Sequence, residues 1–383
     1  MLVVKTPKNS APDILPTRNY AIDALRFIAV CFVIYIHIFA INTGFVYSES
    51  LSWNTADVLF GLARLAVPVF FAISGWYIFS KNRTEQIAKL QKQIPKLIKI
   101  LIAATFGTGA ILWIMSKFNL LAGPLEFFPN VKTLIEMFAL GRSPTIAPLW
   151  FLVSLIIVEV IFWIVSRKFK RDDWLLVPAF IFFGLNLAFG AYRSVTGAPE
   201  LPTLPINELW VMGFAWFCIG YFLAKYFRDT PELIKQKTVV TFLVVTGLLY
   251  LYEYILHTSG APFTFGPYNY HAVFIFTPFI TAGILLLAAR SKVNNKIVRT
   301  LAYLGKNYSL GVFIIHLVVM QPLNAVMVKF GILQAYPSLK LIFTITSTIV
   351  ISFTLTALYY KVKAQLPHTI SKIRSIKSTE SDS

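Results

Sequence analysis

The sequence predicts an all-α integral membrane protein, a polytopic bundle of about ten transmembrane helices. Hydrophobic residues make up 57% and aromatic residues 15% of the 383 residues, and the mean hydropathy is +0.68. Apolar runs of about 20 residues, the length that crosses a bilayer as a helix, recur along the whole chain. Soluble globular domains do not need such runs, so the composition excludes them.

The expected spans divide the chain into three parts. Residues 1–19 form a short polar leader, residues 20–362 a single membrane domain, and residues 363–383 a polar tail that we expect to be disordered from Ser371 onward. The spans of the membrane domain are expected at 20–41, 57–80, 97–116, 148–166, 174–190, 208–226, 238–257, 271–289, 308–328 and 338–361.

The positive charges predict the orientation of these spans. With the amino terminus inside, the cytoplasmic segments hold 27 of the 35 Lys and Arg residues, as the positive-inside rule requires. Both termini are then cytoplasmic, and we expect the cell membrane as the location. Topology accounts for the net charge of +18, so no nucleic-acid partner is expected.

The two cysteines, Cys31 and Cys218, each fall inside a predicted span and show no partner pattern. Neither a disulfide framework nor a metal site is indicated.

The first span carries an unusual polar face. Asp23, Arg26 and His37 interrupt an otherwise apolar run. Eleven residues make about three helical turns, so Arg26 and His37 share one helix face at about 16 Å separation, with Asp23 on the same side. A guanidinium in a span should face protein or water rather than lipid, which makes this face a candidate site. The alternative is that Arg26 snorkels to the headgroups beside Asp23 and that His37 is a satisfied polar residue near the outer interface.

Other polar residues fall inside later spans. By topology, Arg64 lies at about the depth of His37, while Glu159 lies near the depth of Arg26 and is a candidate partner for it. His316 lies nearer the middle of the membrane. Together these side chains predict a polar column that links the two membrane faces.

At this point the motifs resemble those of the membrane acyltransferase-3 family, and the resemblance extends from about Asn19 to Tyr360. The Arg-x10-His spacing of Arg26 and His37 is similar to the family's first-span motif, although Pro148 stands where members often carry His. The further matching stretches are Arg64-Leu-Ala-Val-Pro-Val-Phe-Phe-Ala-Ile-Ser-Gly-Trp76, Leu149-Trp150-Phe-Leu152 and Gly305-Lys-Asn-Tyr-Ser-Leu-Gly-Val-Phe-Ile-Ile-His316.

This resemblance implies a stand-alone O-acyltransferase, of the O-acetyltransferase type that modifies surface polysaccharides. The donor would be acyl-CoA, most simply acetyl-CoA, and the acceptor a glycan hydroxyl; no permanently bound cofactor is implied. We expect His37 as the base, with His316 as its rival, and Arg64 as the group that stabilises the oxyanion. Arg26 would hold the phosphates of coenzyme A, helped by the basic loop 81–99.

The remaining candidate residues have supporting roles. Asp23, Trp150 and Glu159 are expected to support the site, and Ser74 either contacts substrate or, with Gly75, forms a packing notch between helices.

A transporter or flippase of a lipid-linked sugar or acyl group is the alternative function, with Arg26, His37 and Glu159 as relay or substrate contacts. The sequence favours the enzyme, because no pair of Gly/Pro-broken spans recurs in two matching halves.

Overall fold

The computed structural model describes residues 19–43, 55–118, 135, 147–197, 210–258, 273–332 and 336–381. Within these ranges the chain is helical and contains no strand. Its α-helices are α1 (Tyr20–Thr43), α2 (Thr55–Ala63), α3 (Ala66–Ile78), α4 (Arg83–Lys117), α6 (Trp150–Lys168), α7 (Leu176–Phe189), α8 (Arg193–Thr196), α9 (Trp210–Phe227), α10 (Gln236–Thr258), α11 (Thr277–Arg290), α12 (Lys296–Lys329) and α13 (Pro337–Ser381). Three short 3-10 helices, η1 (Ala147–Leu149), η2 (Asp173–Leu175) and η3 (Pro231–Leu233), complete the set.

The helices match the predicted spans. Seven spans in the described ranges are long and apolar enough to cross a membrane by length and composition, if α2 and α3 are counted together as Val58–Ile78. Three shorter apolar helices, Asp173–Phe189, Val211–Phe227 and Thr277–Arg290, coincide with the other predicted runs. The all-helical membrane class is therefore confirmed, and the count of ten spans is approximate.

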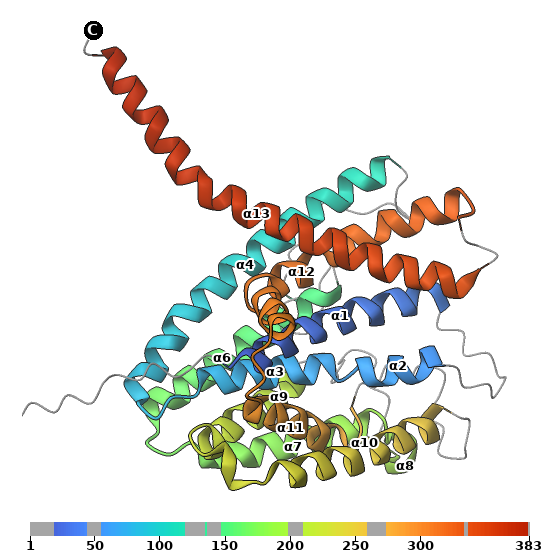
Figure 1. Cartoon of the computed structure of the whole chain (residues 1–383). Helices are drawn as coiled ribbons and strands as arrows, with labels where there is room; N and C mark the ends of the chain where they lie inside the picture. Colours follow the sequence, from blue (N-terminus) through green and yellow to red (C-terminus); the bar gives the residue numbers. More distant parts are fainter. Residues whose placement is uncertain are drawn as a thin grey trace, which may run out of the picture.

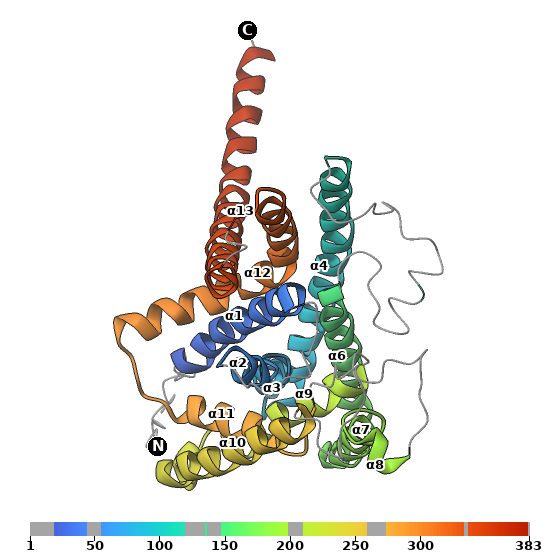
Figure 2. The same cartoon turned by 90° about the vertical axis from the view of Figure 1, so that its right-hand side faces the viewer.

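Helix α1 occupies the middle of the bundle. In Figures 1 and 2 it lies between α12 and α13 on one side and α3 on the other, with α10 and α11 beyond α3. It packs most extensively against α12 and also contacts α2, α3, α11 and α13. Such a central place explains why a helix with three ionisable residues is tolerated, because its polar face meets protein rather than lipid.

Two helix pairs are held together by glycine. A Cβ added to Gly305 of α12 would lie 2.1 Å from the backbone oxygen of Asp23 in α1, and one added to Gly220 of α9 would lie 1.7 Å from that of Ala72 in α3. No larger residue fits at either position. Small residues let membrane helices approach closely, so these contacts fix the pairs α1–α12 and α3–α9.

The predicted span 57–80 is broken in the middle. Helix α2 ends at Ala63 and α3 begins at Ala66, which leaves Arg64 at the break. Pro68 provides the physical reason, because it has no N–H to donate to the carbonyl of Arg64 four residues earlier. The sequence showed this proline, but we had expected one continuous helix.

Two cytoplasmic predictions are corrected. The basic segment 81–99 is not a loop: α4 begins at Arg83, where the side chain of Asn82 accepts hydrogen bonds from the backbone N–H groups of Thr84 and Glu85. The tail is not disordered from Ser371, because α13 continues to Ser381. The leader before Asn19 and the segments 44–54 and 259–272, which the predicted topology places outside, lie outside the described residues.

Candidate active site

The structure brings the two candidate bases together. The ring centroids of His37 on α1 and His316 on α12 are 5.2 Å apart. The sequence had placed His37 near the outer end of its span and His316 nearer the middle of the membrane. Helices α1 and α12 pack closely along their length, with their backbones nearest at Gly305, so the two histidines form one pair inside the bundle.

His316 has a defined tautomer. Its Nδ1 lies 2.7 Å from the backbone oxygen of Phe313, and a carbonyl can only accept, so Nδ1 carries the proton. In the neutral ring the lone pair is then on Nε2. That atom is buried and has no hydrogen-bond partner among the described residues. The fully buried His316 therefore presents a proton acceptor inside the bundle.

A row of aromatic side chains leads to His316. The ring of Phe313 is 6.0 Å from that of His316 and 5.2 Å from that of Phe151. Trp150, a predicted site residue, packs edge-on against Phe151 at 6.4 Å between centroids. Trp150 thus reaches the site through Phe151 and Phe313, which our sequence analysis had not singled out as site residues.

Arg64 lies at the α2–α3 break and is 8% exposed. Its guanidinium carbon is 4.9 Å from the centroid of Phe60. Phe60 in turn stacks on Phe39 of α1 at 4.7 Å, and Phe39 is two residues after His37. This chain of contacts places the arginine near the same stretch of α1 as His37, but Phe39 points about 200° around the helix from His37. The role of Arg64 beside the histidine therefore stays a prediction.

At the other end of the α1 face, Arg26 contacts Asp23 and Tyr77. Its Nη1 is 3.9 Å from Oδ1 of Asp23, and its guanidinium carbon lies 4.7 Å over the Tyr77 ring. The Tyr77 hydroxyl donates to Asp23 at 3.2 Å. The Arg26 side chain remains 25% exposed, so it is only partly enclosed by these two neighbours.

Glu159 does not pair with Arg26, which corrects the sequence interpretation. Its Oε1 accepts a hydrogen bond from Nε2 of Gln93 at 2.6 Å, and α6 packs against α4 rather than against the start of α1. Gln93 lies in the segment predicted as a basic loop, so no sequence signal identified it. The Oε2 atom of Glu159 is buried without a partner among the described residues.

Ser74 and Gly75 behave as a packing notch. The Ser74 hydroxyl donates to the carbonyl of Phe70 at 2.9 Å, within its own helix. A Cβ on Gly75 would lie 2.1 Å from the backbone oxygen of Phe217 in α9. Both observations favour the structural alternative for this pair over contact with substrate.

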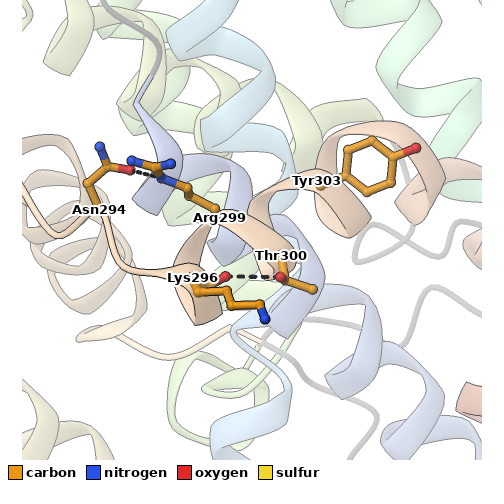
Figure 3. Close-up of a pocket in the computed structure, with 5 residues that line it drawn as sticks. All are labelled: Asn294, Lys296, Arg299, Thr300 and Tyr303. Carbon is orange, nitrogen blue, oxygen red and sulfur yellow. Dashed lines mark hydrogen bonds between the residues drawn. The ribbon is translucent and has the colours of Figure 1, made fainter.

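A separate hollow of about 480 Å³ opens at the start of α12 (Figure 3). It is lined by Asn294, Lys296, Arg299, Thr300 and Tyr303. Within it, Nε of Arg299 donates to Asn294 Oδ1 at 2.6 Å and the Thr300 hydroxyl to the carbonyl of Lys296 at 2.9 Å. Because the hollow precedes His316 by more than three helical turns, it is not part of the histidine site.

The fold and site define a class of protein: a multi-pass helical membrane protein with a buried histidine pair and arginines at two depths. The comparisons with known proteins identify the family. The chain belongs to the acyltransferase-3 family, whose model, described as an acyltransferase domain, matches residues 19–359. It is therefore a membrane acyltransferase by family.

Curated relatives are more distant. The chain is 23% identical over 279 residues to a serine/alanine racemase of Enterococcus gallinarum, covering 69% of this chain and 36% of the relative. It is 25% identical over 225 residues to an amino-acid racemase of Enterococcus faecalis, covering 57% and 29%. The matches thus span about a third of these relatives, and no solved structure matches the chain.

Proposed function

We propose that this protein is an O-acyltransferase of the cell membrane that moves an acyl group, in the simplest case acetyl, from cytoplasmic acyl-CoA to a hydroxyl of an extracytoplasmic or lipid-linked glycan. The observation that carries the proposal is the pairing of His37 with His316, whose ring centroids are 5.2 Å apart. His37 is on the helix face of α1 that we expect it to share with Arg26. Both termini are cytoplasmic in this proposal, so Arg26 faces the donor side.

The donor would bridge the two ends of the α1 face. With its phosphates near Arg26, an extended pantetheine arm would carry the thioester toward His37, about 16 Å further along the helix. The acceptor hydroxyl would approach from the outer side. Donor and acceptor would then meet inside the bundle, where the aromatic wall around Phe313 restricts access of water to the thioester.

The chemistry follows from the groups at the meeting point. His37, which is less completely buried than His316, takes the proton of the acceptor hydroxyl as its oxygen attacks the thioester carbonyl carbon. Arg64 stabilises the negative charge that develops on the carbonyl oxygen. The tetrahedral intermediate then collapses, the carbon–sulfur bond breaks, and the coenzyme A thiolate takes up the proton from the histidine. The ester and free coenzyme A are the products.

In this scheme His316 holds the ring of His37 in place, and its own Nε2 is a second proton acceptor next to His37. Phe313 holds the His316 ring through the Nδ1 hydrogen bond, so Nε2 stays unprotonated in the neutral ring. Asp23 supports Arg26, while Trp150 supports the aromatic wall and Glu159 the packing of α6 on α4.

Mass spectrometry of surface glycans, from cells with and without the protein, tests the proposal. We expect an acyl-sized mass, 42 Da for acetyl, on the glycan only when the protein is present. The same purified protein should transfer labelled acetyl from acetyl-CoA to that glycan. If proteoliposomes instead move a lipid-linked sugar across the bilayer without changing its mass, the protein is a flippase and the proposal fails.

A further inference from the structure

The cytoplasmic ends of α3 and α9 hold an arginine with unused hydrogen-bonding capacity. Nη1 of Arg228 donates to the backbone oxygen of Phe79, the residue that ends α3, at 2.8 Å. The guanidinium carbon lies 5.4 Å from the ring centroids of both Phe79 and Trp76. Nη2 of Arg228 is buried and has no hydrogen-bond partner among the described residues. One branch of the guanidinium is therefore anchored and the other is not used.

Arg290 shows the same property at the end of α11. Its Nε and Nη1 are buried without partners in the described part of the chain. The preceding carbonyls of Ala288 and Ala289 accept hydrogen bonds from the Asn19 side chain, at 3.2 and 2.9 Å. The start of α1 is thereby tied to the end of α11, which also contacts α3, α9 and η3.

These contacts place three arginines at one end of the bundle, which we call the mouth and which is the cytoplasmic end in the proposed topology. The guanidinium of Arg26 lies over the ring of Tyr77 of α3. The guanidinium of Arg228 lies over the rings of Trp76 and Phe79, close to Tyr77 in the sequence. Arg290 ends the helix that Asn19 joins to α1. The start of α1 and the ends of α3, α9 and α11 therefore meet at this mouth.

Buried guanidinium N–H groups without partners are unfavourable, because desolvation is not offset by a hydrogen bond. Arg83, another cytoplasmic arginine, shows the usual solution: it donates to the backbone oxygens of Val165, Ser166, Phe169 and Lys170 at the end of α6. Arg228 and Arg290 have no such set of acceptors in the described chain. A ligand with several anionic oxygens would provide them, and guanidinium groups bind phosphate through paired hydrogen bonds.

We infer that Arg228 and Arg290 join Arg26 in a binding site for the phosphate groups of the acyl donor, the 3′-phospho-ADP part of coenzyme A. This inference rests on the proposed function. Both new arginines are only partly buried as residues, so each side chain keeps an exposed part. Asp229 and Glu85 act on Arg228 through their charge, but Asp229 is bonded to Lys81 at 2.6 Å and neither carboxylate accepts a hydrogen bond from Nη2 of Arg228. Lipid phosphate has the same chemistry and is separated from the donor by the experiment.

The experiment measures binding of coenzyme A, 3′-dephospho-coenzyme A and pantetheine to the full chain in phosphatidylcholine nanodiscs. We expect Arg228→Gln and Arg290→Gln each to weaken coenzyme A binding about tenfold, and to leave pantetheine binding unchanged. For at least one variant, the loss should be smaller with 3′-dephospho-coenzyme A. Arg171→Gln removes an exposed cytoplasmic charge and is the matched control, which should bind coenzyme A as the parent does.

Further variants and lipids keep the result decisive. Arg228→Lys retains a donor for the Phe79 carbonyl but lacks the second branch, so it should fold and still bind coenzyme A more weakly. Unchanged coenzyme A affinity in folded Arg228 and Arg290 variants would overturn the inference. So would variants that, in nanodiscs containing phosphatidylglycerol, retain this lipid less well but bind coenzyme A as the parent does. If the parent protein itself neither binds coenzyme A nor transfers acetyl, the proposed function fails instead.

Discussion

The histidine end and the arginine end of the α1 face satisfy their polar groups differently. At the histidine end, the rings of His37 and His316 lie 5.2 Å apart, and the atom without a hydrogen-bond partner among the described residues is a proton acceptor, Nε2 of His316. At the arginine end, Arg26, Arg228 and Arg290 lie near helix ends. The N–H groups of Arg228 and Arg290 without partners among the described residues are hydrogen-bond donors. A proton acceptor inside the bundle is suited to removing a proton from a hydroxyl. Hydrogen-bond donors at the mouth are suited to binding an anion. The comparison shows that the two ends of one helix have different polar surroundings because different helices pack against them.

The largest effect is expected at the histidine pair. His37→Ala should bind acyl-CoA as the parent does but lose about a hundred- to ten-thousand-fold in transfer rate, which is the usual contribution of a positioned base. His316→Ala should retain measurable activity, because His37 remains. Steady-state transfer of labelled acetyl measures both. Near-parental rates in His37→Ala together with an inactive His316→Ala would reassign the base.

A smaller effect, on binding rather than on the chemical step, is expected at Arg26. Arg26→Ala should weaken acyl-CoA binding about 10- to 100-fold, the range for losing a hydrogen bond to a charged group. Arg26→Lys should lose less, because an ammonium keeps the charge but not the paired geometry. Isothermal titration of each variant measures this loss. Unchanged affinity in both would leave Arg26 as a structural partner of Asp23 and Tyr77.

We expect the hydrogen bond of Glu159 to affect the stability of the protein and not the binding of coenzyme A. Gln93→Leu removes the hydrogen bond to the buried Glu159 carboxyl and should destabilise the protein by about 1–3 kcal/mol. Gln91→Leu, at an exposed position of the same helix, is the control and should change stability little. Thermal unfolding in detergent measures both. A coenzyme A affinity altered by Gln93→Leu alone would connect Glu159 to the donor site.

Cysteine labelling tests on which side of the membrane each end of the bundle lies, and it is expected to change the protein least. In a chain without Cys31 and Cys218, a cysteine replacing Ser50 should react with an impermeant maleimide in intact cells. One replacing Lys292 should react only after lysis, because the charge bias places it inside. The opposite pattern would invert the topology and exchange the donor and acceptor sides.

The sequence predicted the helical class, the positions of the spans and the shared face of Arg26 and His37, because these depend on composition and on helical period. It did not predict the break at Arg64, although Pro68 was visible, since a proline within a span also occurs in unbroken helices. The Gln93 partner of Glu159, the contact of Arg228 with α3, and the hydrogen bonds from Asn19 to the end of α11 depend on how distant helices pack. One sequence without homologues carries no local signal for such contacts.

The glycine contacts at Gly305 and Gly220 join backbone to backbone, and contacts of that kind do not slide. Helices α1 and α12 therefore form one rigid pair, and α3 and α9 another. His37 and His316 both lie in the first pair and keep their spacing, while Arg64 lies at the α2–α3 break, outside both pairs. We expect spin labels on α1 and α12 to keep a fixed distance when acyl-CoA binds, and labels on α1 and α3 to draw together. Binding would then move the two helix pairs relative to each other without changing the histidine pair.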